Sequence, residues 1–210
     1  MGSNPICPVR SSIAQLVERL TVNQYVPGSS PGGGVLKKDI FSIPIFEDKI
    51  DLDKLIVPYT DEDFKPSWDS SIPSTLQSQL YIPESTYQYL YEVISSNLGP
   101  YGFLASKLRF DGPWVNKYSK YDYQDVHIHP NSQWSFIIYI DVYSKTSFLN
   151  PSMGMIQNHM GKSTPEFELD YKPDLEPGSI IIFPSFLMHL VNSGNIGTTI
   201  AGNVLIDYER

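Results

Sequence analysis

The sequence has little cysteine, little charge and no long apolar run. Cys7 is the only cysteine in 210 residues, so no disulfide can form within the chain, which fits a reducing, cytoplasmic setting. No run of about 18 apolar residues occurs, so we expect no membrane span. The N-terminus also lacks a continuous apolar stretch, so we expect no signal peptide. The net charge is −8 without a visible Lys/Arg cluster, and we expect no nucleic-acid partner.

Several common catalytic motifs are also absent. The sequence contains no P-loop, no glycine-rich dinucleotide fingerprint and no G-x-S-x-G elbow. Cys7 lies in an atypical N-terminal stretch, so we do not expect a cysteine nucleophile. We interpret the acidic pair Asp122 and Asp125 as solvated surface carboxylates. These absences leave metal chemistry as the main catalytic hypothesis.

The residues that are abundant favour strands. Hydrophobic residues make up 41% and aromatic residues 13% of the chain, with 17 prolines and 14 glycines to form turns. Residues 1–34 differ from the rest. They contain a candidate amphipathic helix at 11–20 and a linker-like "VPGSSPGGG" at 26–34. We predict that residues 1–34 are a disordered tail or a gene-calling artefact, and that residues 35–210 form one domain.

Within that domain the pattern predicts one helix and a series of short strands. "PESTYQYLYEVISSNLG" at 83–99 has helical spacing and ends at a glycine. Strands are expected near 105–110, 113–121, 125–129, 133–143, 166–171, 179–184, 187–191 and 197–208. The polar segment 149–165 is expected to be a long loop, of the kind that covers a site. Many short strands with Gly/Pro turns are typical of a sandwich or barrel.

Three of the four histidines form a suggestive pattern. His127 and His129 are two residues apart, so on a strand both imidazoles point to the same face. His189 lies at the end of the apolar stretch "IIIFPSFLMHLV". The pattern is typical of metal-binding jelly rolls, while ordinary hydrogen-bonded histidines remain the alternative. His159 lies in the polar segment, and we interpret it as a surface residue.

Two longer blocks carry a family resemblance. "GPWVNKYSKYDYQDVHIHPNSQWSFIIYI" and "LEPGSIIIFPSFLMHLV" resemble the Fe(II)- and 2-oxoglutarate-dependent oxygenases. The likeness is greatest to their phage and marine bacterial branch, which is distantly related to the prolyl hydroxylases. It extends over the whole chain after the linker. It implies a mostly β fold, a double-stranded β-helix (a cupin-like jelly roll) with flanking helices.

The resemblance also implies a site that uses Fe(II), 2-oxoglutarate and O2. His127 and His189 match the family's two iron-binding histidines, and His129 stands where most members have an acidic residue. Residues at further matching or same-face positions are expected to contact the co-substrate: Asn116, Tyr118, Ser135, Tyr139, Thr199 and Asn203. The implied activity is hydroxylation of a small molecule or peptide, with no indication of oligomeric state.

One expected residue is missing. The family places an arginine shortly after the distal histidine to pair with the far carboxylate of 2-oxoglutarate, but no basic residue occurs between His189 and Arg210. Lys145 and Arg109 are the candidate replacements. The gap keeps two alternatives open: a three-histidine metal dioxygenase that does not use 2-oxoglutarate, and a non-catalytic jelly-roll binding module.

Overall fold

The computed structural model describes residues 25–26, 35–36, 42–67, 72–103, 107–160 and 167–207. The chain divides into two compact units, Met1–Ile43 and Pro44–Arg210. In the first unit, β1 (Tyr25–Val26) pairs antiparallel with β2 (Val35–Leu36). The helix expected at 11–20 and most of the linker expected at 26–34 lie outside the described residues. The domain boundary after residue 34 therefore stays a prediction.

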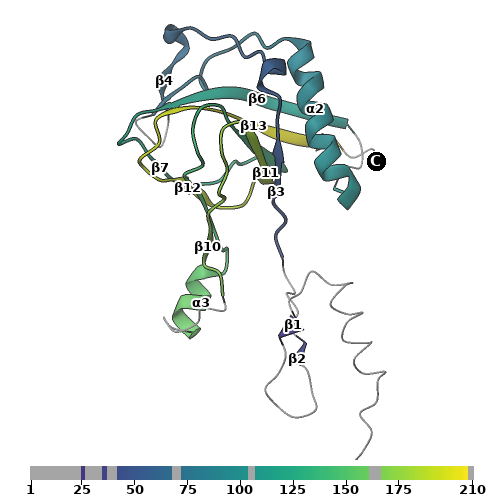
Figure 1. The fold of residues 1–210 in the computed structure, drawn as a ribbon, viewed down its shortest axis with the longest axis vertical. Coiled ribbons are helices and arrows are strands. Elements are labelled where there is room, and N and C mark those ends of the chain that lie inside the picture. Colours follow the sequence, from purple (N-terminus) through teal and green to yellow (C-terminus); the bar gives the residue numbers. More distant parts are fainter. Residues whose placement is uncertain are drawn as a thin grey trace, which may run out of the picture. The chain divides into compact units, whose positions relative to one another are not determined.

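The second unit consists mainly of two antiparallel sheets (Figure 1). The seven-stranded sheet has the order β3 (Phe46–Lys49), β11 (Ser179–Pro184), β8 (Trp134–Tyr139), β13 (Gly197–Asp207), β6 (Lys107–Tyr118), β5 (Pro73–Ser74) and β4 (Lys65–Pro66). The four-stranded sheet has the order β10 (Asp170–Tyr171), β9 (Thr146–Leu149), β12 (His189–Val191) and β7 (Gln124–His127).

The chain winds between these sheets as a jelly roll. From β6 onwards, β6, β8, β11 and β13 join the larger sheet, while β7, β9, β10 and β12 form the smaller one. Strands that are consecutive in the chain therefore lie mostly in opposite sheets, which is the topology of a double-stranded β-helix. The predicted fold class, mostly β with flanking helices, is confirmed.

A helix covers the outer face of the larger sheet. The helix α2 (Glu84–Leu98) begins after Pro83 and ends before Gly99, as the sequence pattern predicted. Its buried face carries Leu90, Ile94 and Leu98 at helical spacing, and these side chains pack with sheet residues such as Ile138 and Ile182 in one hydrophobic cluster. Because strand side chains alternate, the residues between them point inward, toward the second sheet.

A β-bulge changes the direction of side chains along β6. Ala201 of β13 lies opposite Trp114, but Asn203, two residues further on, lies opposite Asp111, three residues back. Gly112 and Pro113 of β6 thus face the single residue Gly202 of β13. Gly112 has a φ of +101°, which disfavours other residues, and a Cβ there would come within 2.8 Å of the Trp114 ring. The bulge therefore brings Asp111 opposite Asn203.

Three details differ from the sequence-based expectation. The strands expected at 105–110 and 113–121 are the single bulged strand β6, and β9 was not predicted. The segment 149–165, expected to be a long loop, contains the helix α3 (Met153–Met160), none of whose residues is buried. Its apolar residues Met153, Ile156 and Met160 follow helical spacing, but the run is only two turns long. The described residues also contain the 3-10 turns Leu52–Lys54, Asp61–Asp63 and Gly99–Tyr101.

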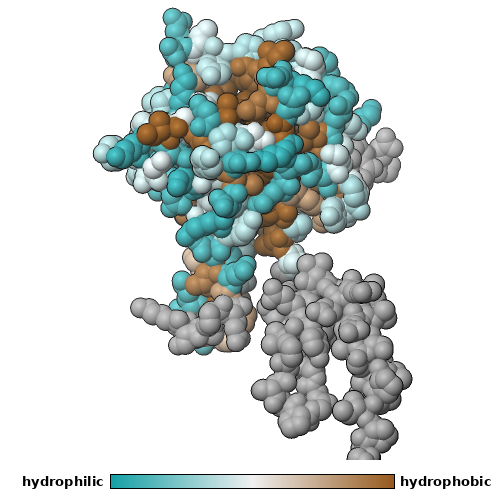
Figure 2. Space-filling model, in the orientation of Figure 1, coloured by the Kyte–Doolittle hydropathy of each residue, from teal (hydrophilic) through white to brown (hydrophobic). Residues whose placement is uncertain are grey.

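Hydrophobic and hydrophilic residues interleave over the face of this unit in Figure 2. Exposed large hydrophobic side chains include Tyr81, Tyr121 and Phe186, and such scattered exposure is usual. None of the helices in the described residues combines the length and the hydropathy that crossing a membrane requires.

Candidate metal centre and its cavity

Two paired strands of the smaller sheet bring the predicted histidines together. His127 ends β7 and His189 begins β12, and the two residues lie directly opposite each other in the antiparallel ladder. His129 follows two residues after His127, and its backbone N–H donates to the Ser185 carbonyl at 2.9 Å. One ring nitrogen from each of His127, His129 and His189 lies within 4.8 Å of the other two. The three imidazoles thus converge on one point.

Hydrogen bonds fix the tautomer of each ring. Nδ1 of His127 lies 2.7 Å from the Asp125 carbonyl oxygen, and Nδ1 of His189 lies 3.0 Å from the Leu187 carbonyl oxygen. Nδ1 of His129 lies 2.6 Å from Oδ1 of Asn203. Carbonyl oxygens can only accept, so Nδ1 carries the proton in every ring and Nε2 keeps its lone pair. Three free Nε2 atoms are what a metal ion requires of histidine.

The surroundings also favour the uncharged form of His129 and His189. His189 is 1% exposed, and burial lowers its pKa well below the usual value, helped by the neighbouring His127 and His129. Burial likewise lowers the pKa of His129 to about 4. The Phe148 and Phe183 rings flank His189 at centroid distances of 5.6 and 4.8 Å. Neutral imidazole is the form that binds a metal, so the environment and the donor set agree.

A polar network holds Asn203 against His129. Oγ of Ser135 donates to Oδ1 of Asn203 at 2.9 Å, and Nδ2 of Asn203 lies 3.4 Å from Oδ2 of Asp111. Ser135 is fully buried and also contacts Oγ of Ser185 at 2.8 Å. Ser135 is absent from the residues that line the cavity. The structure thus places the predicted co-substrate residue Ser135 behind Asn203, where it orients that amide.

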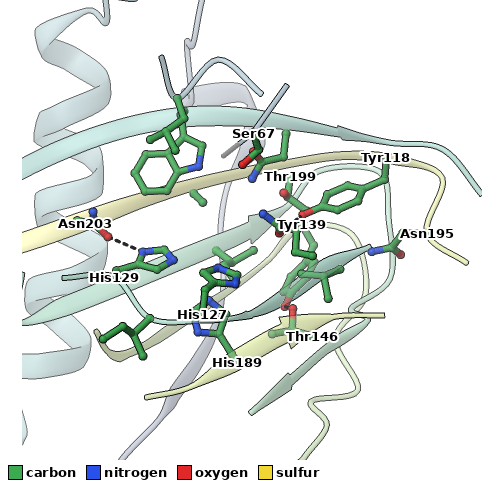
Figure 3. A pocket seen from close by; sticks show the side chains of 18 of the residues that line it. Ser67, Tyr118, His127, His129, Tyr139, Thr146, His189, Asn195, Thr199 and Asn203 are labelled. Atoms are coloured by element: carbon green, nitrogen blue, oxygen red, sulfur yellow. Dashed lines mark hydrogen bonds between the residues drawn. The ribbon is translucent and has the colours of Figure 1, made fainter. Parts of the chain in front are cut away.

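The histidines form one end of a cavity of about 280 Å³ (Figure 3). Away from the histidines lies a group of uncharged polar side chains, which we call the amide end: Asn116, Tyr118, Tyr139, Thr146, Asn195 and Thr199. Asn116, Thr199 and Tyr139 lie side by side on β6, β13 and β8. Of the residues that the sequence predicted for co-substrate binding, all but Ser135 line the cavity.

The two tyrosines of the amide end are neutral and hydrogen-bonded. The Tyr118 hydroxyl donates to Oε1 of Gln124 at 2.8 Å, and burial raises the pKa of Tyr118. The Tyr139 hydroxyl lies 3.0 Å from Oγ1 of Thr146 and accepts from Oγ of Ser144 at 3.0 Å. Burial raises the pKa of Tyr139 as well. Neither phenol therefore supplies a charge to the cavity.

The two candidate carboxylate partners lie elsewhere. Arg109 pairs with Asp207 at 2.8 Å on the exposed part of the larger sheet, and Lys145 is exposed in the turn before β9. Neither lines the cavity, and no lysine, arginine, aspartate or glutamate does so among the described residues. Lys145 was expected to continue the face of Tyr139, but β8 ends at Tyr139, so the alternation stops there.

Sequence reasoning missed Thr146 and Asn195. Thr146 lies on β9, which was not predicted, and Asn195 lies in the turn before β13. A turn asparagine carries no periodic signal, and its burial to 4% exposure emerges only in the folded chain.

A comparison with family models identifies a segment of this chain. Residues 112–198 match the model described as "Putative 2OG-Fe(II) oxygenase", which is less than half of the 210 residues. The matched segment contains all three histidines. It therefore carries the sequence signature of the Fe(II)- and 2-oxoglutarate-dependent oxygenases, whose cofactors are iron and 2-oxoglutarate. The resemblance seen in the two motif blocks is confirmed at this level.

Solved structures include distant likenesses. A 2OG-Fe(II) oxygenase family oxidoreductase from Burkholderia pseudomallei has 12% identity and a TM-score of 0.43, with coverage of 77% of this chain and 68% of that one. A prolyl-4-hydroxylase from Pseudomonas putida has 13% identity and a TM-score of 0.45, with 70% and 79% covered. HygX from Streptomyces hygroscopicus, with nickel, 2-oxoglutarate and hygromycin B bound, has 10% identity and a TM-score of 0.44, with 75% of both chains covered. No curated protein matches the chain.

Proposed function

We propose that this protein is an Fe(II)- and 2-oxoglutarate-dependent oxygenase that hydroxylates a small molecule or a peptide. The overall reaction would convert a substrate C–H, 2-oxoglutarate and O2 into the alcohol, succinate and CO2. The observation that carries the proposal is the convergence of three imidazoles whose Nδ1 atoms are all engaged as donors. The family match over residues 112–198 supports the same activity.

His127, His129 and His189 would hold the metal through Nε2. Imidazole is a suitable ligand for Fe(II), and when bound the ion supplies open coordination positions for the 2-oxo acid and for O2. The residues of this chain provide the rest. Asn203 orients His129, and Phe148 and Phe183 exclude water from the buried side of His189.

Other parts of the proposal rest on the sequence alone. Assignment to the phage and marine bacterial branch is supported by the opening "IFSIPIF" and the two motif blocks. A cytoplasmic location is supported by the single cysteine.

An anaerobic titration tests the proposal. Apo protein receives Fe(II) and then 2-oxoglutarate while the visible absorption is recorded, and we expect a weak charge-transfer band on addition of the 2-oxo acid. The His189→Ala variant should give no band. The matched control His159→Ala, on the exposed helix α3, should behave like the wild type. Failure to bind Fe(II) would contradict the proposal and favour a non-catalytic jelly-roll module.

A second candidate is a three-histidine metal dioxygenase that does not use 2-oxoglutarate. It is favoured by the absence of any cation among the described residues that line the cavity. Fe(II) binding without a band, together with oxygen consumption that does not depend on 2-oxoglutarate, would support this candidate over the first.

A further inference from the structure

The amide end of the cavity contains two side chains with unused hydrogen-bonding capacity. Asn116 and Asn195 are each 4% exposed and line the cavity. Neither side-chain amide has a hydrogen-bond partner within the part of the chain that the structure describes, in contrast to Asn203, which bonds His129, Ser135 and Asp111. Among the described residues, Oγ of Ser95 is the only fully buried side-chain polar atom without a partner, so the amides of Asn116 and Asn195 are accessible from the cavity. A ligand in the cavity can therefore complete their hydrogen bonds.

The neighbouring hydroxyl groups are already engaged. Tyr118 donates to Gln124, and the Tyr139 hydroxyl is bonded to both Thr146 and Ser144. A carboxylate entering this region would find no cation, and only the N–H groups of Asn116 and Asn195 could donate to it, because the tyrosine hydroxyls are already engaged. Neutral donors compensate a buried charge less well than a cationic partner does. The amide end is therefore poorly suited to a charged group.

Asparagine amides suit an uncharged polar group. Each amide offers two N–H donors and a carbonyl acceptor, so Asn116 and Asn195 can both donate to and accept from a ligand. A carboxamide has the same two capacities, whereas a carboxylate can only accept. The hydrogen-bonding character of this end of the cavity therefore complements a neutral group that both donates and accepts.

We propose that the amide end selects a 2-oxo acid whose far end is an uncharged hydrogen-bonding group, such as a carboxamide, over one that ends in a carboxylate. This inference rests on the proposed function, because the 2-oxo acid is taken to reach the metal at the histidine end while its tail contacts Asn116 and Asn195. 2-Oxoglutarate itself is expected to bind, but less tightly than its 5-amide.

A matched pair of ligands tests the proposal without any variant. The full chain loaded with Fe(II) is titrated anaerobically with 2-oxoglutarate and, separately, with its 5-amide, which has nearly the same size and differs in the charge of the far group. Calorimetry gives both dissociation constants, and the fluorescence of the cavity residue Trp114 provides a second readout. We expect the amide to bind at least 10-fold more tightly. Equal or tighter binding of 2-oxoglutarate would overturn the inference and leave the proposed function standing.

Variants at the amide end show whether the amides are responsible. Asn195→Ala should weaken binding of the 5-amide about 10-fold and leave Fe(II) affinity unchanged, whereas Asn158→Ala, on the exposed face of α3, should change neither. Asn195→Lys should reverse the preference, because it places a cation at the amide end. An unchanged preference in both Asn195 variants would overturn the assignment. If Fe(II) binds but neither acid does, the inference and the proposed function both fail.

Discussion

The two ends of the cavity satisfy their polar groups in different ways. At the histidine end every ring has its Nδ1 bonded to an oxygen within the protein, so the direction of each Nε2 is set before any ligand arrives. At the amide end Asn116 and Asn195 have no such partner among the described residues, and the structure leaves their bonds to be completed. The contrast indicates that one end is preorganised for a small ion with strict geometry, while the other recognises a group by hydrogen bonding.

Removal of a histidine should have the largest effect, because it removes a ligand from the histidine end. His189→Ala deletes one of three metal ligands and should lower Fe(II) affinity by about 1,000-fold or more, roughly 4 kcal/mol. Equilibrium dialysis with metal analysis measures the effect, with His159→Ala as the matched control. Retained affinity in His189→Ala would remove His189 from the ligand set.

Removal of the Asn203 side-chain oxygen, which accepts from Nδ1 of His129, should lower metal affinity less than loss of a ligand. Asn203→Ala leaves the ring without its acceptor, and loss of such a partner typically lowers metal affinity about 10–100-fold. Asn203→Asp keeps an acceptor at the same place and should retain most of the affinity. The pair is compared by competition with a chromophoric chelator. Equal losses in both variants would point to a packing role instead.

The pKa of His129 predicts a pH dependence of the apo protein. The folded-state pKa of about 4 lies below the unfolded value of about 6.5. Below pH 6.5 the unfolded chain therefore binds more protons, so stability falls as the pH falls toward 4. For His129 alone the free energy of unfolding should drop by about 2 kcal/mol between pH 7 and pH 5. Urea titrations measure it, and His129→Gln should have a shallower dependence.

Strand β13 carries residues of both ends of the cavity, and a substitution within it should have the smallest effect of those predicted here. Gly202 lies between Ala201 and Asn203 on β13, and a Cβ there would come within 2.6 Å of the fully buried Phe136 ring. Gly202→Ala should cost about 1–2 kcal/mol of unfolding free energy through overpacking. Gly154→Ala, in α3 with no atom within 4 Å of the new Cβ, should instead be neutral or stabilising. Thermal unfolding of both variants distinguishes these outcomes.

Sequence reasoning identified features that a short periodic pattern encodes. The helical spacing of Tyr87, Leu90, Tyr91 and Ile94 predicted α2. The i, i+2 spacing of His127 and His129 predicted imidazoles on one side of a strand. His189 lies opposite His127 because β7 pairs with β12. The family resemblance implied that these histidines meet, whereas local propensity cannot predict which strands pair.

The features that escaped prediction depend on where strands end and on long-range burial. If the alternation of side chains in β8 continued beyond Tyr139, Lys145 would point to the same side as Tyr139. The strand ends at Tyr139, however, and Thr146 on the unpredicted strand β9 lines the cavity instead. Arg109 was a candidate from the sequence, and only the fold reveals its pairing with Asp207. Asn195 required knowledge that its turn is packed against the cavity.

The bulge in β6 gives this one strand two opposite phases of side-chain direction. Leu108 and Phe110, before the bulge, pack with the cluster beneath α2, whereas Trp114 and Asn116, after it, face the cavity, although all four have even numbers. Deletion of Gly112 would remove the bulge and restore one continuous alternation of side chains along β6. In half of the strand, the residues that now point inward would then point outward, and the reverse. In this strand a change of length by one residue is therefore equivalent to many simultaneous substitutions.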